Sequence, residues 1–296
     1  MHKKMLLLIN PSAGKGGYKN GLGEALEVFY RGGYIPTVCF TTGLGSALSL
    51  TIKHASDYDA LTCIGGDGTL SDVISGLMRI KNPPPLGYMP AGTANDVAST
   101  LKLSRNLAVA AERIVSGKET AFDVGAFGPK EYFAYIAAFG AFTDVSYETP
   151  QQQKRSLGQL AYIFEAMSRL TKLESRFVRV EHDGGVTEGD FIFGGVTNSR
   201  SLAGVVRIKD SVVDLSDGLF ELILIRNPKN LANLNHILSA ILSQNYDDYE
   251  EVVMIKSRFA RFVFDLPAAW TRDGENGGAH TDLEIKNRKA AIRFLL

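Results

Sequence analysis

The chain has little cysteine: Cys39 and Cys63 are the only two among its 296 residues. A disulfide framework or a structural zinc site needs more cysteines at closer spacing. Each of the two lies inside an apolar run that predicts a strand. We therefore expect both to be buried, unreactive thiols in a reducing compartment.

The chain also lacks net charge, since 32 Lys and Arg residues balance 32 Asp and Glu residues. A broad nucleic-acid footprint requires clustered Lys and Arg, so no nucleic-acid partner is expected. The same balance gives no sign of a polybasic membrane anchor. Any contact with a membrane would have to be local and apolar.

Long hydrophobic runs are missing as well. The N-terminal run, Met5–Ile9, is followed at once by Asn10 and Pro11, whereas a secretory signal needs about 7–15 apolar residues. No later run reaches the roughly 18 apolar residues of a membrane-spanning helix. The sequence predicts a cytoplasmic protein without a transmembrane segment.

What the chain does contain is typical of a globular protein, with 45% hydrophobic and 22% charged residues, and its length favours two domains. In the first part, short apolar runs alternate with helical patterns, which predicts a parallel sheet covered on both faces. Ligands bind such sheets at the carboxyl ends of the strands. The predicted strands are Met5–Ile9, Ile35–Phe40, Ala60–Ile64 and Leu86–Met89, and the predicted helices are Asn20–Tyr30, Ser46–Ala55, Leu70–Arg79 and Leu107–Val115.

After about Ala121 the pattern changes to successive strands separated by turn signals, which predicts a largely antiparallel sandwich or barrel. Two helices with one apolar face each, Ser156–Leu173 and Leu231–Leu242, interrupt it. Each helix either caps the core of this second domain or contacts lipid or membrane. The predicted strands are Phe122–Phe127, Tyr132–Ala138, Phe177–His182, Phe191–Thr197 and Leu219–Ile225.

Three polar, glycine-rich loops follow strands of the first domain. The first, Asn10–Gly16, contains Gly14-Lys15 but is not a Walker A loop, because Ile9 stands where the first glycine is required and no Ser or Thr follows the lysine. Its glycines can still offer backbone N–H groups to a phosphate.

The second loop, Gly65–Val73, has three glycines in four residues, Gly65, Gly66 and Gly68, and leads into a helix near Thr69. Backbone can approach a ligand closely there, and the start of the helix favours an anion. Asp67 would repel a phosphate unless a magnesium ion or a proton-transfer task requires it. The loop therefore predicts a phosphate site with a metal or an acid–base function.

The third loop, Pro90–Asp96, adds an amide and a second carboxylate through Asn95 and Asp96. Far downstream, Trp270–Glu275 is typical of a hairpin turn with solvated charges. Any one loop could be a plain turn between a strand and a helix. All three lie at one predicted sheet edge, which favours a shared binding site.

In this order, the loops resemble the three signature loops of the diacylglycerol kinase catalytic-domain family. That family includes small soluble bacterial lipid kinases and, more distantly, sphingosine and ceramide kinases. Asp217-Gly218 and Asp273-Gly274-Glu275 also lie where the family places them. The three matching loops are Asn10–Gly16, Gly65–Gly76, and Pro85–Gly87 leading into Pro90–Asp96. Together with the two later motifs, they extend the resemblance over nearly the whole chain.

The resemblance implies an N-terminal three-layer α/β/α nucleotide-binding domain with a parallel sheet, formed by residues 1–122 and a returning C-terminal strand at about 286–296. It implies a mostly antiparallel β-sandwich domain for the lipid substrate at 123–285, with the active site between the two. The implied activity is an ATP- and Mg²⁺-dependent transfer of the γ-phosphate to a hydroxyl of diacylglycerol or a related lipid. The enzyme would act peripherally at the inner face of the membrane, and a homodimer would fit the family.

Roles for single residues follow from the same resemblance. Asp67 would handle magnesium and protons, and Glu275 would be the general base, with Asp67 as its competitor. Asp96 and Asp273 would hold a magnesium–water network, and Asp217 would belong to a structural metal loop. The nucleotide would contact Asn10, Gly14, Thr42, Gly65, Gly66, Gly68, Thr69, Gly92, Thr93 and Asn95.

The chain departs from the family pattern at a few positions. Asp72 stands where Glu is usual, Ser71 where Asn is common, Val97 where Phe is usual and Thr100 near a frequent Arg. None of these removes a residue that the chemistry needs. Two other functions remain open: an NAD kinase, which shares a Gly-Gly-Asp-Gly loop, and a non-catalytic nucleotide sensor that regulates a membrane enzyme.

Overall fold

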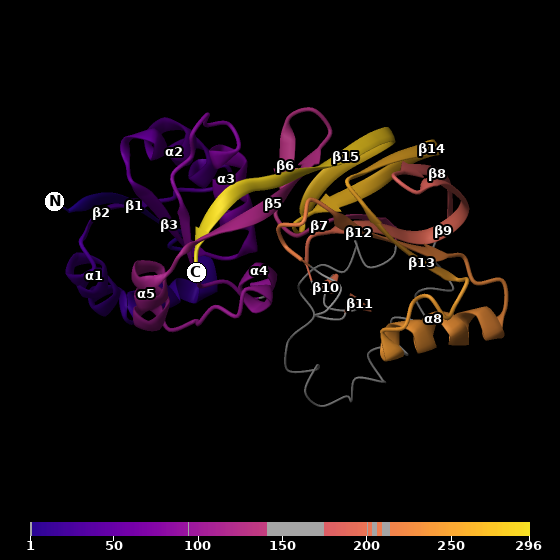
Figure 1. The fold of residues 1–296 in the computed structure, drawn as a ribbon, viewed down its shortest axis with the longest axis horizontal. Coiled ribbons are helices and arrows are strands. Elements are labelled where there is room, and N and C mark those ends of the chain that lie inside the picture. The colour runs from indigo at the N-terminus through magenta and orange to yellow at the C-terminus, as the bar shows by residue number, and fades with distance from the viewer. Residues whose placement is uncertain (1, 94, 141–174, 200, 203–205, 209–213) are drawn as a thin grey trace.

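The computed structural model describes residues 2–93, 95–140, 175–199, 201–202, 206–208 and 214–296. Its mixed α/β architecture, with many antiparallel strands, confirms the predicted fold class at that level (Figure 1). The helix predicted over Ser156–Leu173 lies outside the described residues. No helix in the described ranges is long and apolar enough to cross a bilayer.

The N-terminal part is built on four strands whose mutual pairings are parallel, in the order β4-β3-β1-β2. β1 carries Leu6 and Leu8 on one face, which belong to the same buried cluster as side chains of α2 and α3. Met5 and Leu7, on the other face, cluster with α1 and α5. Side chains alternate along a strand, so an unbroken apolar run buries both faces. The elements are β1 (Lys3–Ile9), η1 (Ala13–Lys19), α1 (Leu22–Arg31), β2 (Tyr34–Phe40), α2 (Ser46–His54), η2 (Ala55–Asp57), β3 (Ala60–Gly65), α3 (Asp67–Leu77), β4 (Leu86–Pro90), α4 (Asp96–Thr100) and α5 (Leu107–Ser116).

The helix α3 begins earlier than the periodicity predicted, at Asp67 and not at Leu70. Gly66 is its N-cap in extended conformation, and Asp67 lies in the first turn. A carboxylate there interacts favourably with the positive end of the helix dipole. Asp67 is therefore a helix-terminal residue and not a member of an irregular turn.

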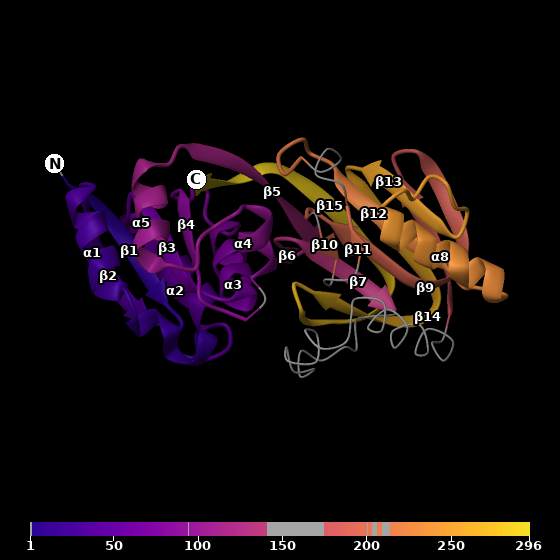
Figure 2. The same ribbon diagram turned by 90° about the horizontal axis from the view of Figure 1, so that it is seen from below.

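The C-terminal part is a set of antiparallel strands in the order β13-β12-β9-β7-β14-β15, with β5, β6 and β8 branching from it. α8 lies along one side of it (Figure 2). The elements are β5 (Glu119–Phe127), β6 (Glu131–Phe133), β7 (Ile136–Gly140), β8 (Arg176–His182), β9 (Gly185–Thr197), β10 (Ser201–Leu202), β11 (Val206–Arg207), β12 (Phe220–Arg226), α8 (Leu231–Ser243), β13 (Val252–Ser257), β14 (Phe259–Arg272) and β15 (Glu275–Leu295).

One predicted strand was wrong: Tyr132–Ala138 is two strands, β6 and β7, separated by a corner at Ala134 and Tyr135. The corner exists because the amides of both residues donate to the carboxylate of Asp273, at 2.7 and 3.0 Å. A contact made from more than a hundred residues away overrides the local strand pattern.

The long strand β15 joins the two parts, as both views show (Figures 1 and 2). It pairs with β14, then with β5, and near its end Phe294 pairs in parallel with Leu86 of β4. The fully buried Asp123 holds the strand where its register shifts, accepting from the backbone N–H of Ala290 at 2.7 Å. The same carboxylate accepts from the backbone N–H of Gly218 at 2.7 Å. These bonds fix the direction in which β15 leaves the antiparallel part for the parallel one.

Candidate active site

A cleft of about 780 Å³ lies between the loops of the parallel part and the turn that joins β14 to β15. Five residues that the sequence predicted for the site line it: Asn10, Thr42, Gly68, Thr69 and Glu275. The remaining lining residues are Pro11, Ser12, Thr41, Gly43, Leu44, Ala47, Ser71, Asp72, Ser75, Arg272 and Asn276.

The three glycine-rich loops touch one another. The side-chain amide of Asn10 donates to the hydroxyl of Thr69 at 2.8 Å, which ties the first loop to the second. Gly14 has a φ of +54°, and a Cβ there would overlap the carbonyl of Ala91 in the third loop. Gly92 likewise lies against Gly66, with no room for a Cβ. Only glycine permits this approach, so these loops form one surface.

The third loop is shaped by the side chain of Asn95, which is 2% exposed and has a φ of +57°. Its Oδ1 accepts from the backbone N–H of Gly92 at 2.9 Å, and its Nδ2 donates to the Gly92 carbonyl at 2.7 Å. Tyr88 donates to the same Oδ1 at 3.3 Å. In this structure the side chain of Asn95 therefore holds the third loop together.

Asp67 connects the second loop to the third. Its Oδ2 accepts from the backbone N–H of Asn95 at 2.7 Å, while its Oδ1 is buried and accepts no hydrogen bond. Burial raises the pKa of this carboxyl, and the amide of Asn95 works against the shift. Asp96 follows Asn95 as the first residue of α4. A buried carboxylate oxygen without a partner, next to a second acidic residue, fits a divalent cation or a proton.

Glu275 reaches the same place from the opposite end of the chain. It is the first residue of β15, and a Cβ added to Gly68 would lie 3.1 Å from its Oε1. Gly68 directly follows Asp67, so the structure brings a carboxylate of the C-terminal part beside the second loop. Of the two acidic residues at the end of the chain that were predicted for the site, Glu275 is the one that lines the cleft.

Asp273 does not point into the cleft. The carboxylate is 3% exposed and accepts from the backbone N–H groups of Ala134, Tyr135 and Ile136 at 2.7–3.1 Å. Its φ of +48° places the residue in the left-handed region. Burial raises its pKa to about 6, and these three amides and a hydrogen bond with Ser71 work in the opposite direction. Its oxygens hold the turn, which leaves little capacity for the predicted magnesium–water network.

Asp217 is not brought to the cleft either. Its Oδ1 accepts from the backbone N–H of Leu219 at 2.8 Å, and its Oδ2 lies 3.6 Å from the amino group of Lys256. Lys256 also lies 3.8 Å from the buried Glu221, whose pKa burial raises to about 8. In the described ranges, no three His, Cys, Asp or Glu side chains come close enough to hold a metal by themselves.

The other predicted residues, Gly65, Gly66, Gly92 and Thr93, shape the loops without lining the cleft; Thr93 accepts through its carbonyl from Arg105 at 2.9 Å. Among the lining residues to which the sequence assigned no role, two are charged: Asp72 and Arg272. Their signal was weak, because a Ser-Asp pair on a helix and an arginine in a hairpin turn are ordinary surface features.

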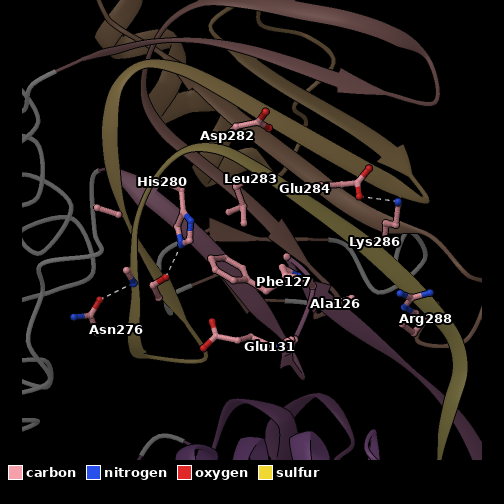
Figure 3. A pocket seen from close by; sticks show the side chains of 16 residues that line it. Ala126, Phe127, Glu131, Asn276, His280, Asp282, Leu283, Glu284, Lys286 and Arg288 are labelled. Atoms are coloured by element: carbon pink, nitrogen blue, oxygen red, sulfur yellow. Dashed lines mark hydrogen bonds and ion pairs between the residues drawn. The ribbon is translucent and has the colours of Figure 1, made fainter.

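A second pocket, of about 940 Å³, shares Asn276 with the cleft. Figure 3 shows the side chains that line this second pocket. The hairpin of β5 and β6 and the first half of β15 line it. Phe127 and His280 form part of its wall, with ring centroids 5.4 Å apart. Glu131, on β6, lines this pocket and is ion-paired at 3.1 Å with Arg272, which lines the cleft.

Comparison with known proteins agrees with the resemblance. The family model for the diacylglycerol kinase catalytic domain matches residues 4–127. Diacylglycerol kinases of Staphylococcus aureus strains MRSA252 and Newman are 33% identical over 282 residues, covering 94% of this chain and 88% of theirs. The chain therefore belongs to the diacylglycerol kinase catalytic-domain family. It is an enzyme of the class that transfers a phosphoryl group to an alcohol.

Solved structures of similar fold come from Bacillus anthracis str. Sterne and carry the name diacylglycerol kinase. One has a TM-score of 0.81 at 23% identity and covers 99% of this chain and 95% of its own. Another has a TM-score of 0.77 at 21% identity and covers 99% and 96%. At this level of identity the likeness establishes the fold alone.

Proposed function

We propose that the chain is an ATP- and Mg²⁺-dependent lipid kinase that transfers the γ-phosphate to a hydroxyl of diacylglycerol or a related lipid. The observation that carries the proposal is the position of Glu275 beside Gly68, in a cleft that Asn10 and Thr69 also line. A base from one part of the chain thereby faces phosphate-binding loops from the other. Phosphoryl transfer requires this alignment above all.

The nucleotide would bind on the parallel part, a three-layer domain formed by residues 1–122 and the end of β15. The touching loops around Gly14, Gly66 and Gly92 offer backbone to the phosphates, and the N-terminus of α3 favours their negative charge. The hydroxyls of Thr42 and Thr69, which line the cleft, supply further contacts.

The residues present fit a magnesium ion. Mg²⁺ in kinases takes one or two carboxylates together with substrate phosphates and water, so no complete protein cage is needed. The unpartnered Oδ1 of Asp67 would be such a ligand, with Asp96 beside it. When bound, the ion offsets negative charge on the phosphates.

Glu275 would accept the proton of the lipid hydroxyl as that oxygen attacks the γ-phosphate. Asp67 remains its competitor for this role. The antiparallel part, residues 123–285, would hold the lipid, and the enzyme would work as a cytoplasmic protein at the inner face of the membrane, as a monomer or a homodimer.

A phosphate-transfer assay tests the function. The protein is incubated with γ-labelled ATP and Mg²⁺ and with either NAD or mixed micelles that contain diacylglycerol, sphingosine or ceramide. We expect label in an extracted lipid, none in NAD, and loss of transfer when EDTA removes the metal. Label in NAD would support the NAD kinase, and nucleotide binding without any transfer would support the sensor.

Gly14→Ala is expected to weaken ATP binding by about tenfold or more, because the new Cβ pushes the first loop off the carbonyl of Ala91 and a φ of +54° strains alanine. Calorimetric titration with ATP measures the change. Gly17→Ala is the matched control, since its Cβ would meet nothing within 4 Å. Equal affinities of the two variants would contradict the packed-loop surface.

A further inference from the structure

Arg272 is the one cationic side chain lining the cleft among the side chains that the structure describes. The other charged lining residues there are Asp72 and Glu275. A cleft with two carboxylates repels a polyphosphate unless cations offset them. Asp72 lies on α3, the helix that Asp67 begins, and Glu275 lies beside Gly68 of the same helix. Arg272 is the counter-charge that the described lining of the cleft supplies to these two carboxylates.

The backbone of Arg272 is held on both sides. It is the last residue of β14, where it pairs with Ala137 of β7 and with Glu275 of β15. Trp270, two residues earlier, is 1% exposed within the aromatic core. A guanidinium on a backbone fixed in this way can move only through its side-chain torsions, so its reach is limited to the cleft and the adjoining pocket.

The donors of Arg272 are only partly used. Its Nη1 lies 3.1 Å from Glu131 Oε2, and its Nε is buried without a hydrogen-bond partner. Glu131 is 51% exposed on β6 and lines the second pocket beside Phe127 (Figure 3). Ion pairs with such an exposed partner are weak, so this pair is easily exchanged for a stronger anion.

The positive charge of Arg272 also affects the pKa of the neighbouring Asp72. Burial raises the pKa of Asp72, a negative charge on Glu275 raises it further, and Arg272 lowers it. The three side chains therefore interact across the cleft. An arginine next to the base Glu275 is placed where charge develops during transfer.

We propose that Arg272 leaves Glu131 when the nucleotide binds and contacts its terminal phosphate, stabilising the phosphoryl group in transit to the acceptor. The inference rests on the proposed kinase function and adds a catalytic residue to it. A guanidinium suits the task because it is always charged and presents paired N–H donors to phosphate oxygens. Since Arg272 comes from β14, ATP binding would then depend on both parts of the molecule.

Two substitutions test the proposal: Arg272→Met, which keeps length and removes charge, and Arg272→Lys, which keeps charge without the fork. With lipid acceptor, we expect Arg272→Met to lower kcat by about 10²–10³-fold and Arg272→Lys by less, as for other charge-stabilising groups. Arg261→Met is the matched control on the same strand, because Arg261 pairs on the surface with Asp282 at 2.7 Å. It should turn over like the wild type.

A binding measurement separates a phosphate contact from a merely structural role. The wild type should prefer ATP to ADP, and Arg272→Met should lose about tenfold or more in ATP affinity and far less in ADP affinity. Glu131→Gln should bind ATP more tightly, because the competing anion is gone. A folded Arg272→Met variant with wild-type kcat and an unchanged ATP-to-ADP ratio would overturn the proposal, and so would weaker ATP binding by Glu131→Gln.

Failure of the proposed kinase function can be distinguished from failure of the proposal for Arg272. If the wild type transfers phosphate to no lipid in the panel, the proposed function fails at that step. The ATP-to-ADP affinity ratio then still reports whether Arg272 contacts the terminal phosphate. Thermal melting of each variant confirms that the fold is retained.

Discussion

Asp67→Asn is expected to lower kcat by about 10²–10⁴-fold without loss of stability. The amide keeps the shape and can still accept from the backbone N–H of Asn95, now 2.7 Å from Oδ2. It cannot serve as an anionic ligand or take a proton. Since burial raises the pKa of Asp67, the charged form is disfavoured in the folded protein, and a neutral isostere should unfold no more readily than the wild type at neutral pH.

Glu275→Gln is expected to cause a loss of similar size for a different reason, and the pair decides which carboxylate is the general base. Removal of the base should lower kcat and leave the Mg²⁺ concentration needed for half-maximal rate unchanged. Removal of a magnesium ligand should instead raise the Mg²⁺ concentration needed for half-maximal rate. We expect the first result for Glu275→Gln and the second for Asp67→Asn. Glu27→Gln, on the exposed side of α1, is the control. Near-normal turnover in both cleft variants would remove the mechanism.

The parallel part could be predicted from the sequence because its signals are local. An apolar run such as Ala60–Ile64 predicts a strand that is buried on both faces. The glycines directly after it predict a turn in which the backbone of one loop can approach the backbone of another. The contacts Gly14–Ala91 and Gly66–Gly92 then place the loops together. Each of these predictions depends only on residues that are adjacent in the sequence or on adjacent strands of the sheet.

The end of the chain could not be predicted in the same way. In β14 and β15, charged residues such as Arg261 and Lys286 alternate with buried ones such as Phe262 and Ile285, a pattern weaker than an apolar run. The family resemblance implied a magnesium role for Asp273, and nothing in its sequence neighbourhood shows that its hydrogen-bond partners are amides 137–139 residues earlier. Turn residues acquire such roles only from tertiary structure.

Asp273 holds the backbone N–H groups of three residues of β7 and the corner before it, and we call this set of hydrogen bonds the Asp273 clamp. Asp273→Ala should therefore lower the unfolding free energy at pH 7 by about 2–4 kcal/mol. The substitution leaves the amides of Ala134, Tyr135 and Ile136 buried without their acceptor. It also frees the turn that carries Glu275, so kcat should fall too. Urea denaturation measures the stability. Asp282→Ala, which breaks a surface pair with Arg261, should cost no more than about 1 kcal/mol; equal losses would show that Asp273 is no clamp.

The same carboxyl makes stability depend on pH, in a direction that follows from its burial. Its pKa is about 6 in the folded protein and about 3.9 in an unfolded chain, so folding takes up a proton between these values. The stability that this proton uptake contributes is complete below about pH 4 and is lost as pH rises through 6. The unfolding free energy of the wild type, minus that of Asp273→Asn, should therefore fall by about 2–3 kcal/mol between pH 4.5 and 7.5 and stay level above. Three amide donors alone would lower the pKa and reverse this slope. A difference that rises with pH would therefore show that the hydrogen bonds, and not burial, govern the charge of Asp273.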